Sequence, residues 1–223
     1  MEIEIRFLIQ CYFGDIEDPY LAAIDRAYID MQTHTVSAGK EQIFEMRHKE
    51  SEYLYERLKN IQKEESYDVW HEKTARRMKE ISSPVELSYG QIQKWINMSV
   101  KYLYTFKSLG LQTVDDYFVN HKSVFHAPLD SYVLDHLKVS DKWSQIPTYE
   151  RYKEIEKLIT FEDEYTNWPN YAKEVLVKTN GCERIADKDS YKRYIQVNYS
   201  DKGKTYCGKI RWQTRNVECP EED

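Results

Sequence analysis

The segment that runs from Ser88 to Gly110 constrains the fold most, because it carries every local signal of one long, buried α-helix. Ser88 and Gln91 stand at the spacing of a capping box, in which each side chain bonds the backbone N–H of the other residue. Apolar residues then recur at helical spacing as Trp95, Met98, Tyr102 and Phe106. Such a stripe needs other elements to cover it, so the segment predicts a protein built by packing helices together.

The rest of the chain also favours helices. Only 7 glycines and 6 prolines occur among 223 residues, which disfavours a β-sandwich with its many turns. Asp18, Ser66 and Thr148 each stand where a helix cap is expected, and a long charged helix is predicted over residues 41–63. We therefore predict a mainly α fold, a multi-helix bundle of about seven or eight helices over residues 1–178.

Two details of this helical body are less determined. Residues 3–13 alternate in the manner of a strand, but Leu8 and Tyr12 break the polar face, so a buried helix fits equally well. For the two helices that follow, an apolar stripe is expected to point inward. Its members are Leu21, Ile24, Tyr28 and Met31 in the first helix, and Ile43, Phe44, Leu54, Leu58 and Ile61 in the second, where the stripe is incomplete.

Residues 179–223 differ in composition and are predicted to form a small basic β-hairpin appendage with an acidic tail. From Gly181 to Asn216 there are nine Lys or Arg against four acids, in a chain whose net charge is −6. Alternation over residues 194–199 and 206–212 predicts two strands with a turn near Gly203. Cations that alternate with aromatic residues suit nucleic acid, although an ordinary solvated hairpin has the same pattern. The candidate nucleic-acid-binding residues are Lys192, Arg193, Lys204, Lys209 and Arg211.

The 4 cysteines form no CxxC pair, which favours reduced thiols in an intracellular, cytoplasmic protein. A Cys207–Cys219 disulfide, or a metal site completed by a histidine, is the alternative. The apolar N-terminal segment is short and contains charged residues, so we expect neither a signal peptide nor contact with a membrane. We expect no cofactor.

Lys94 and Asp130 are the residues most suggestive of catalysis. Lys94 falls in the first turns of the Ser88 helix, and Asp130 falls at the start of another helix that opens on Pro128. An amine nucleophile can capture C1′ of a nucleotide as a Schiff base, while a carboxylate stabilises the developing sugar cation. The alternative is that both residues have ordinary structural roles, with Asp130 as a helix cap and Lys94 as a solvated lysine.

The motif around Asp130 resembles that of a known family. Pro128-Leu129-Asp130-Ser131-Tyr132-Val133 is similar to the Pro-Val-Asp-x-x-Val segment of the helix-hairpin-helix DNA glycosylase superfamily, whose aspartate is catalytic. Gln93-Lys94 resembles the Gln-Lys of its archaeal 8-oxoguanine glycosylase branch. The resemblance implies a glycosylase-like helical fold, DNA as the partner, and excision of a modified base. The chain departs from the family at the glycine-rich hairpin, where Ser108–Leu111 holds a single glycine, and it has no iron–sulfur cysteine set.

Histidines and aromatic residues near Asp130 are candidates for the wall of a substrate pocket. We expect Trp95, Phe125 and His126 to contact the flipped base. His121, His126 and His136 also invite a metal-binding interpretation, but their spacing does not place two ligands on one helix face.

A second hypothesis comes from another class of protein. The same fold without the chemistry would be a helical binding protein whose partner is a protein or a nucleic acid. The acidic net charge and the missing glycine-rich hairpin favour it.

Overall fold

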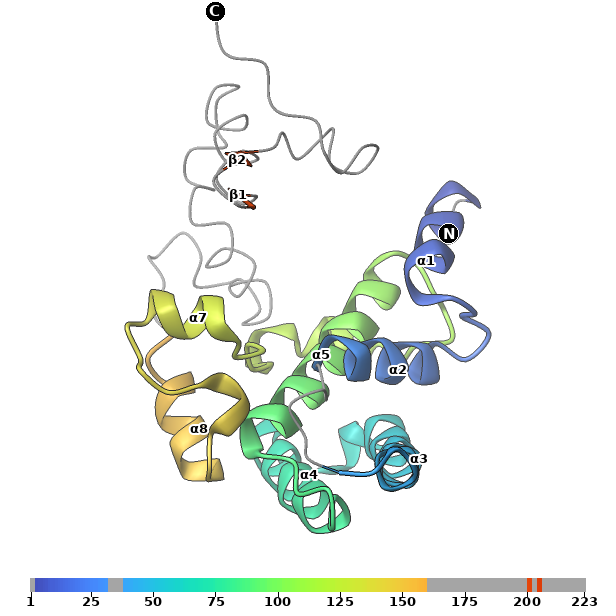
Figure 1. The fold of residues 1–223 in the computed structure, drawn as a ribbon. Coiled ribbons are helices and arrows are strands. Elements are labelled where there is room, and N and C mark those ends of the chain that lie inside the picture. The colour runs from blue at the N-terminus through green and yellow to red at the C-terminus, as the bar shows by residue number, and fades with distance from the viewer. Residues whose placement is uncertain (1–2, 32–37, 160–199, 202–203, 206–223) are drawn as a thin grey trace, which may run out of the picture. The chain divides into compact units, whose positions relative to one another are not determined.

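The computed structural model describes residues 3–31, 38–159, 200–201 and 204–205. The chain divides into two units, residues 1–174 and 175–223, which are treated separately. The described part of the first unit holds eight α-helices (Figure 1), which confirms the prediction of a mainly helical protein. They are α1 Ile3–Phe13, α2 Pro19–Met31, α3 Lys40–Lys59, α4 Tyr67–Ile81, α5 Tyr89–Ser108, α6 Tyr117–Asn120, α7 Ser131–His136 and α8 Tyr149–Glu156. Short 3₁₀ segments lie at Ile61–Lys63 (η2), Lys122–Val124 (η3) and Trp143–Gln145 (η4).

Helix α5 is the element around which this unit packs, since it contacts α2, α4, α6 and α8 (Figure 1). Its predicted capping box forms: Gln91 N–H donates to Ser88 Oγ at 3.1 Å, and Ser88 N–H donates to Gln91 Oε1 at 3.0 Å. Every residue from Gly90 to Val100 is buried, so α5 is enclosed on all sides and not only along its apolar stripe. The polar side chains in that stretch must therefore find partners inside the protein.

The other predicted helix starts are also confirmed. Ser66 Oγ accepts a hydrogen bond from Val69 N–H at 3.3 Å at the start of α4, and Thr148 Oγ1 accepts one from Arg151 N–H at 3.1 Å at the start of α8. Asp18 Oδ1 accepts from Tyr20 N–H at 3.0 Å at the start of α2. Each cap satisfies a backbone donor that the first helical turn leaves without a partner.

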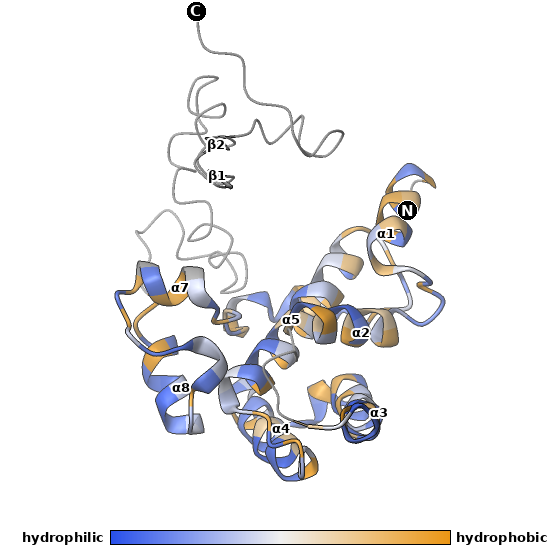
Figure 2. Ribbon diagram, in the orientation of Figure 1, coloured by the Kyte–Doolittle hydropathy of each residue, from blue (hydrophilic) through white to orange (hydrophobic). Residues whose placement is uncertain are grey.

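Helix α1 settles the ambiguity in residues 3–13: the segment is a helix, and the strand alternative is wrong. The expectation that it is buried is also wrong, because Ile9 is its one buried residue and Ile3 is 77% exposed. Only its C-terminal end is packed, where the Phe13 ring meets Phe106 edge-on with 4.5 Å between centroids. Figure 2 shows the apolar character of this projecting helix.

The inward faces of α2 and α3 differ from the prediction at two positions. Leu21 is 45% exposed and Phe44 is 71% exposed, although both were expected to point inward. On α3 the buried residues are Met46, Glu50, Leu54 and Leu58, which follow one another at intervals of four. Glu50 lies within this buried stripe and interrupts its apolar pattern in the sequence. The sequence pattern therefore favours Phe44 as a core residue, although its side chain is exposed.

Other predictions fall partly outside the described residues. In the second unit, β1 Ser200–Asp201 pairs antiparallel with β2 Lys204–Thr205. The longer predicted strands, the boundary near residue 178, and Cys182, Cys207 and Cys219 lie outside the described residues. Among the residues the structure describes, no helix has both the length and the apolar character needed to cross a membrane.

Candidate active site

Lys94 and Asp130 lie together where two helices begin. Lys94 is in the second turn of α5, and Asp130 immediately precedes α7. Lys94 Nζ is 3.9 Å from Asp130 Oδ2, and the two side chains are only 11% and 5% exposed. The other carboxylate oxygen, Oδ1, accepts a hydrogen bond from Val133 N–H at 3.2 Å. Asp130 therefore caps α7 with one oxygen and faces the lysine with the other.

Gln93 fixes the relative positions of this pair. Its Nε2 donates to the Leu129 carbonyl at 2.9 Å, and its Oε1 accepts from Leu129 N–H at 3.1 Å. The side-chain amide thus pairs with the backbone of the residue before Asp130 in both directions. Because Gln93 also neighbours Lys94 on α5, these two bonds hold the carboxylate beside the amine.

Trp143 lies over the lysine amine, a contact that the sequence analysis did not identify. Lys94 Nζ is 4.4 Å from the centroid of the indole ring, within the range of a cation–π contact. The η4 segment approaches α5 closely, since a Cβ on Gly90 would come within 1.6 Å of the Trp143 carbonyl oxygen. Ser88 Oγ also donates to the Ser144 carbonyl at 2.8 Å. Only glycine at position 90 permits this approach, and a glycine near the start of a buried helix was the signal available in the sequence.

Asn97 links this site to the interior. Its Nδ2 is 3.1 Å from both the Ala127 carbonyl and the Tyr152 hydroxyl, and its Oδ1 is 3.0 Å from His71 Nε2. His71 Nδ1 is in turn 3.0 Å from the Tyr149 hydroxyl. These contacts join α4, α5, α8 and the segment before α7 through side chains that are all buried. Burial lowers the pKa of His71 well below its usual value, so this histidine is neutral at pH 7.

His126 belongs to a cluster at the outer end of this network. Its Nδ1 is 2.8 Å from the Tyr152 hydroxyl, and its Nε2 is 2.6 Å from Asp68 Oδ1, which also accepts from Lys153 Nζ at 2.6 Å. The hydrogen bond from His126 and the one from Lys153 hold the pKa of Asp68 well below its usual value. Burial lowers the pKa of His126, against the opposing effect of Asp68. His126 Nε2 also lies 3.1 Å from Lys153 Nζ, so the tautomer of His126 decides whether Nε2 donates to Asp68 or accepts from Lys153.

The aromatic residues predicted for the pocket wall are core residues. Trp95 is fully buried on the α2 side of α5, where its Nε1–H donates to the Ile24 carbonyl at 3.0 Å. Phe125 is fully buried against Tyr67, with 5.0 Å between ring centroids. Of the three predicted wall residues, His126 alone is connected to the Lys94 site, and the connection runs through Tyr152 and Asn97.

A turn with one glycine, Gly110, follows α5. Gly110 has a φ of 93°, its N–H donates to the Lys107 carbonyl at 3.0 Å, and Leu111 N–H donates to the Phe106 carbonyl at 3.0 Å. This is a Schellman motif, in which the backbone amides of the turn close the end of the helix. The amides of Gly110 and Leu111 are therefore already bonded within the protein.

The predicted nucleic-acid-binding residues belong to the second unit. Lys204 lies in β2 of the second unit, and Lys192, Arg193, Lys209 and Arg211 lie outside the described residues. His121 is exposed and stacks on Tyr117 with 4.2 Å between ring centroids. Within the described ranges, no group of three or more His, Cys, Asp or Glu residues could hold a metal ion.

No protein-family model matches this chain, and neither a curated protein nor a solved structure is significantly similar to it. The site's own chemistry thus carries any functional argument.

Proposed function

We propose that the chain is a DNA glycosylase-like enzyme of the helix-hairpin-helix type, which removes a modified base by lyase chemistry at Lys94. The observation that carries the proposal is the 3.9 Å approach of Lys94 Nζ to Asp130 Oδ2, with both side chains largely buried. These are the two residue types, at the two helix starts, that the resemblance assigns to catalysis.

In the proposed reaction the glycosidic bond breaks and the base leaves with the bonding electrons and takes up a proton. The Asp130 carboxylate stabilises the positive charge that develops on the sugar. The Lys94 ammonium must first lose a proton, because only the free amine has a lone pair; the amine then bonds to C1′ and gives up a second proton, which Asp130 can accept. Opening of the sugar ring turns this adduct into a protonated Schiff base.

The surroundings of the amine favour this role in two ways. The backbone of the residue before Asp130 is paired with Gln93, so the carboxylate does not need to reorganise during the reaction. The indole of Trp143 offers a flat surface beside the amine, the kind of surface on which a flipped base stacks.

Contact with the DNA backbone would differ from that of the family. Because the turn amides of Gly110 and Leu111 are bonded to α5 carbonyls, phosphates would be held by side-chain cations instead. The basic residues predicted at Lys192, Arg193, Lys204, Lys209 and Arg211 are the candidates for that contact.

The test is borohydride trapping on duplex DNA that carries 8-oxoguanine or an abasic site. Borohydride reduces a Schiff base to a stable amine, so the wild-type protein should form a covalent adduct and Lys94→Ala should not. Lys101→Ala is the matched control, since it removes a lysine two turns further along the same helix and should leave the adduct unchanged. Absence of an adduct on both substrates would contradict the proposed chemistry.

Asp130→Asn separates catalysis from capping. Asparagine caps a helix about as well as aspartate, so any loss in the free energy of unfolding beyond about 0.5 kcal/mol reports the missing charge beside the buried Lys94. The amide carries no charge to stabilise a sugar cation, so adduct formation from 8-oxoguanine should slow by about 100-fold or more. Unchanged adduct formation would mean that Asp130 serves only as a helix cap and takes no part in catalysis.

The second candidate function is the non-catalytic helical binding protein. It is favoured by the hydrogen bond from Val133 N–H to Asp130, which gives the carboxylate a structural task that needs no substrate. In that case neither substrate is trapped, and Asp130→Ala costs only the usual value of a cap, about 0.5–2 kcal/mol.

A further inference from the structure

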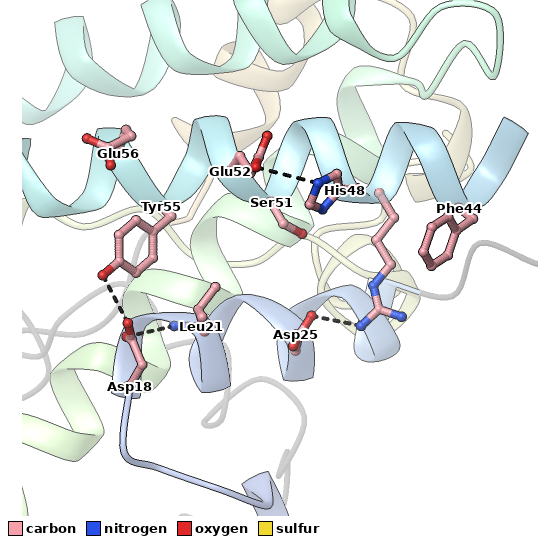
Figure 3. Close-up of a pocket in the computed structure, with 10 residues that line it drawn as sticks. Asp18, Leu21, Asp25, Phe44, His48, Ser51, Glu52, Tyr55 and Glu56 are labelled. Carbon is pink, nitrogen blue, oxygen red and sulfur yellow. Dashed lines mark hydrogen bonds and ion pairs between the residues drawn. The ribbon is translucent and has the colours of Figure 1, made fainter.

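A groove of about 710 Å³ lies between α2 and α3 (Figure 3), and none of its lining residues belongs to the Lys94 site. Its two walls are joined at both ends. Tyr55 OH donates to Asp18 Oδ2 at 2.9 Å near one end, and Arg47 Nη2 donates to Asp25 Oδ1 at 2.7 Å near the other. The groove is therefore already formed in the protein without a ligand.

The shape of this α2–α3 groove suits a chain segment and not a compact metabolite. Its α3 wall runs from Phe44 to Glu56 through residues that share one face of the helix. At a rise of 1.5 Å per residue, that wall is about 18 Å long, or more than three helical turns. The α2 wall, Asp18, Leu21 and Asp25, also follows one helix face. Two antiparallel helix faces with a long depression between them are the usual receptor for a third helix.

Apolar groups are exposed along the groove and provide an anchor point. Phe44 is 71% exposed at one end, and Leu21, in the middle of the α2 wall, is 45% exposed (Figure 3). The Ser51 hydroxyl, between them on the α3 wall, is buried and has no hydrogen-bond partner among the described residues. A partner would thus cover an exposed aromatic ring and an exposed leucine.

The charge of the groove is negative, and most strongly at the end away from Phe44. Asp18, Glu52 and Glu56 gather there, whereas the guanidinium of Arg47 is bonded to Asp25 and covers the Tyr28 ring at 4.6 Å. The carboxylates thus outnumber the basic side chains, since Arg47 is bonded to Asp25 and His48 Nε2 lies 3.5 Å from Glu52 Oε1. Electrostatic complementarity calls for a partner with lysine or arginine near its acidic end.

We propose that the α2–α3 groove docks a basic amphipathic helix from a protein partner. Its apolar side chains lie over Leu21 and Phe44, and its cations meet Glu52, Glu56 and Asp18. This site is distinct from the proposed lyase centre, and its occupation does not depend on the chemistry at Lys94.

The probe is a labelled synthetic peptide of leucine and lysine in helical pattern, about four turns long, whose binding to the full chain is followed by fluorescence anisotropy. The control peptide keeps the leucines and replaces each lysine by glutamate. The lysine peptide should bind and should weaken as salt is raised, whereas the glutamate peptide should not bind. Equal binding of the two peptides, or no binding of either, overturns the proposal.

Two double variants on the same helix give the matched comparison. Glu52→Lys with Glu56→Lys reverses the charge in the groove and should weaken the lysine peptide at least about tenfold. Glu41→Lys with Glu45→Lys makes the same charge change at the same spacing outside the groove and should have an effect of less than about twofold. Equal weakening by both double variants would mean non-specific attraction. Self-association of the chain that Phe44→Ala abolishes would identify a second copy as the occupant instead, and would also overturn the proposal.

Discussion

Glu50 presents the sharpest energetic problem in the molecule. It lies on the inner face of α3, is fully buried, and neither carboxyl oxygen has a hydrogen-bond partner among the described residues. The nearby charge of Lys79, whose ammonium donates to the Leu87 carbonyl at 2.7 Å, favours the ionised form, but its effect is smaller than that of burial. Burial therefore dominates and raises the pKa of Glu50 well above its ordinary value of 4.5.

The raised pKa of Glu50 determines the sign and the upper limit of its effect on the free energy of unfolding. A carboxyl that keeps its proton longer in the folded state than in the unfolded state makes the free energy of unfolding fall as the pH rises past 4.5. The slope is at most about 1.4 kcal/mol per pH unit. At pH 7, which is 2.5 units above 4.5, the loss is at most about 3 kcal/mol. That is a large part of the 5–15 kcal/mol by which domains are typically stable.

Glu50→Gln removes the ionisable proton and keeps the shape of the side chain. Urea unfolding followed by circular dichroism should show wild type and variant within about 1 kcal/mol of each other at pH 4.5. The variant should then be more stable than the wild type at pH 7, by up to about 3 kcal/mol. Glu45→Gln, on the exposed side of α3, is the control and should follow the wild type at both values. Parallel pH profiles for wild type and Glu50→Gln between pH 4.5 and 8 would refute the argument.

Three further predictions concern the site and its network. Gly90→Ala forces the Trp143 carbonyl away from α5, and we expect a loss of roughly 3 kcal/mol in urea unfolding together with a shifted tryptophan emission. Asn97→Ala leaves several buried groups without a partner, and calorimetry should show a loss of about 2–4 kcal/mol. His71 and His126 have pKa values lowered by burial. Their contribution to the stability of the folded state is therefore present above pH 6.5 and is lost as the pH falls below that value. In the Glu50→Gln background, unfolding should therefore need less urea at pH 5.5 than at pH 7.5.

Helix starts could be predicted from the sequence because each depends on a bond between a side chain and a backbone amide three residues away. Ser66, Ser88 and Thr148 all behave in this way. Which face of a helix turns inward was harder to predict, because it is decided by neighbours that are distant in the sequence. Residues 3–13 and Phe44 are the examples, and in the second case a buried carboxylate interrupted the pattern on which the prediction relied.

The proximity of Lys94 and Asp130 was suggested by a local motif, whereas their supporting residues were not. The pairing of Gln93 with the Leu129 backbone joins segments far apart in the chain, and a glutamine in a helix carries no sign of such a partner. Trp143 begins the short 3₁₀ segment η4, and the sequence around it shows no helical periodicity. Its place over the amine follows from the absence of a side chain on Gly90, a fact that gains meaning only once the two segments are seen together.

Helix α1 is fixed at one end only, and this has a consequence for hydrogen exchange. Its packing on the core comes from Ile9 and from the rings of Tyr12 and Phe13, while its first two turns are exposed. An isolated helix of 11 residues is unstable in water, so those first turns have little to hold them closed. Their amides should exchange with solvent deuterium through local opening, long before those of α5. The N-terminal helix would then unfold and refold many times while the core around α5 stays intact.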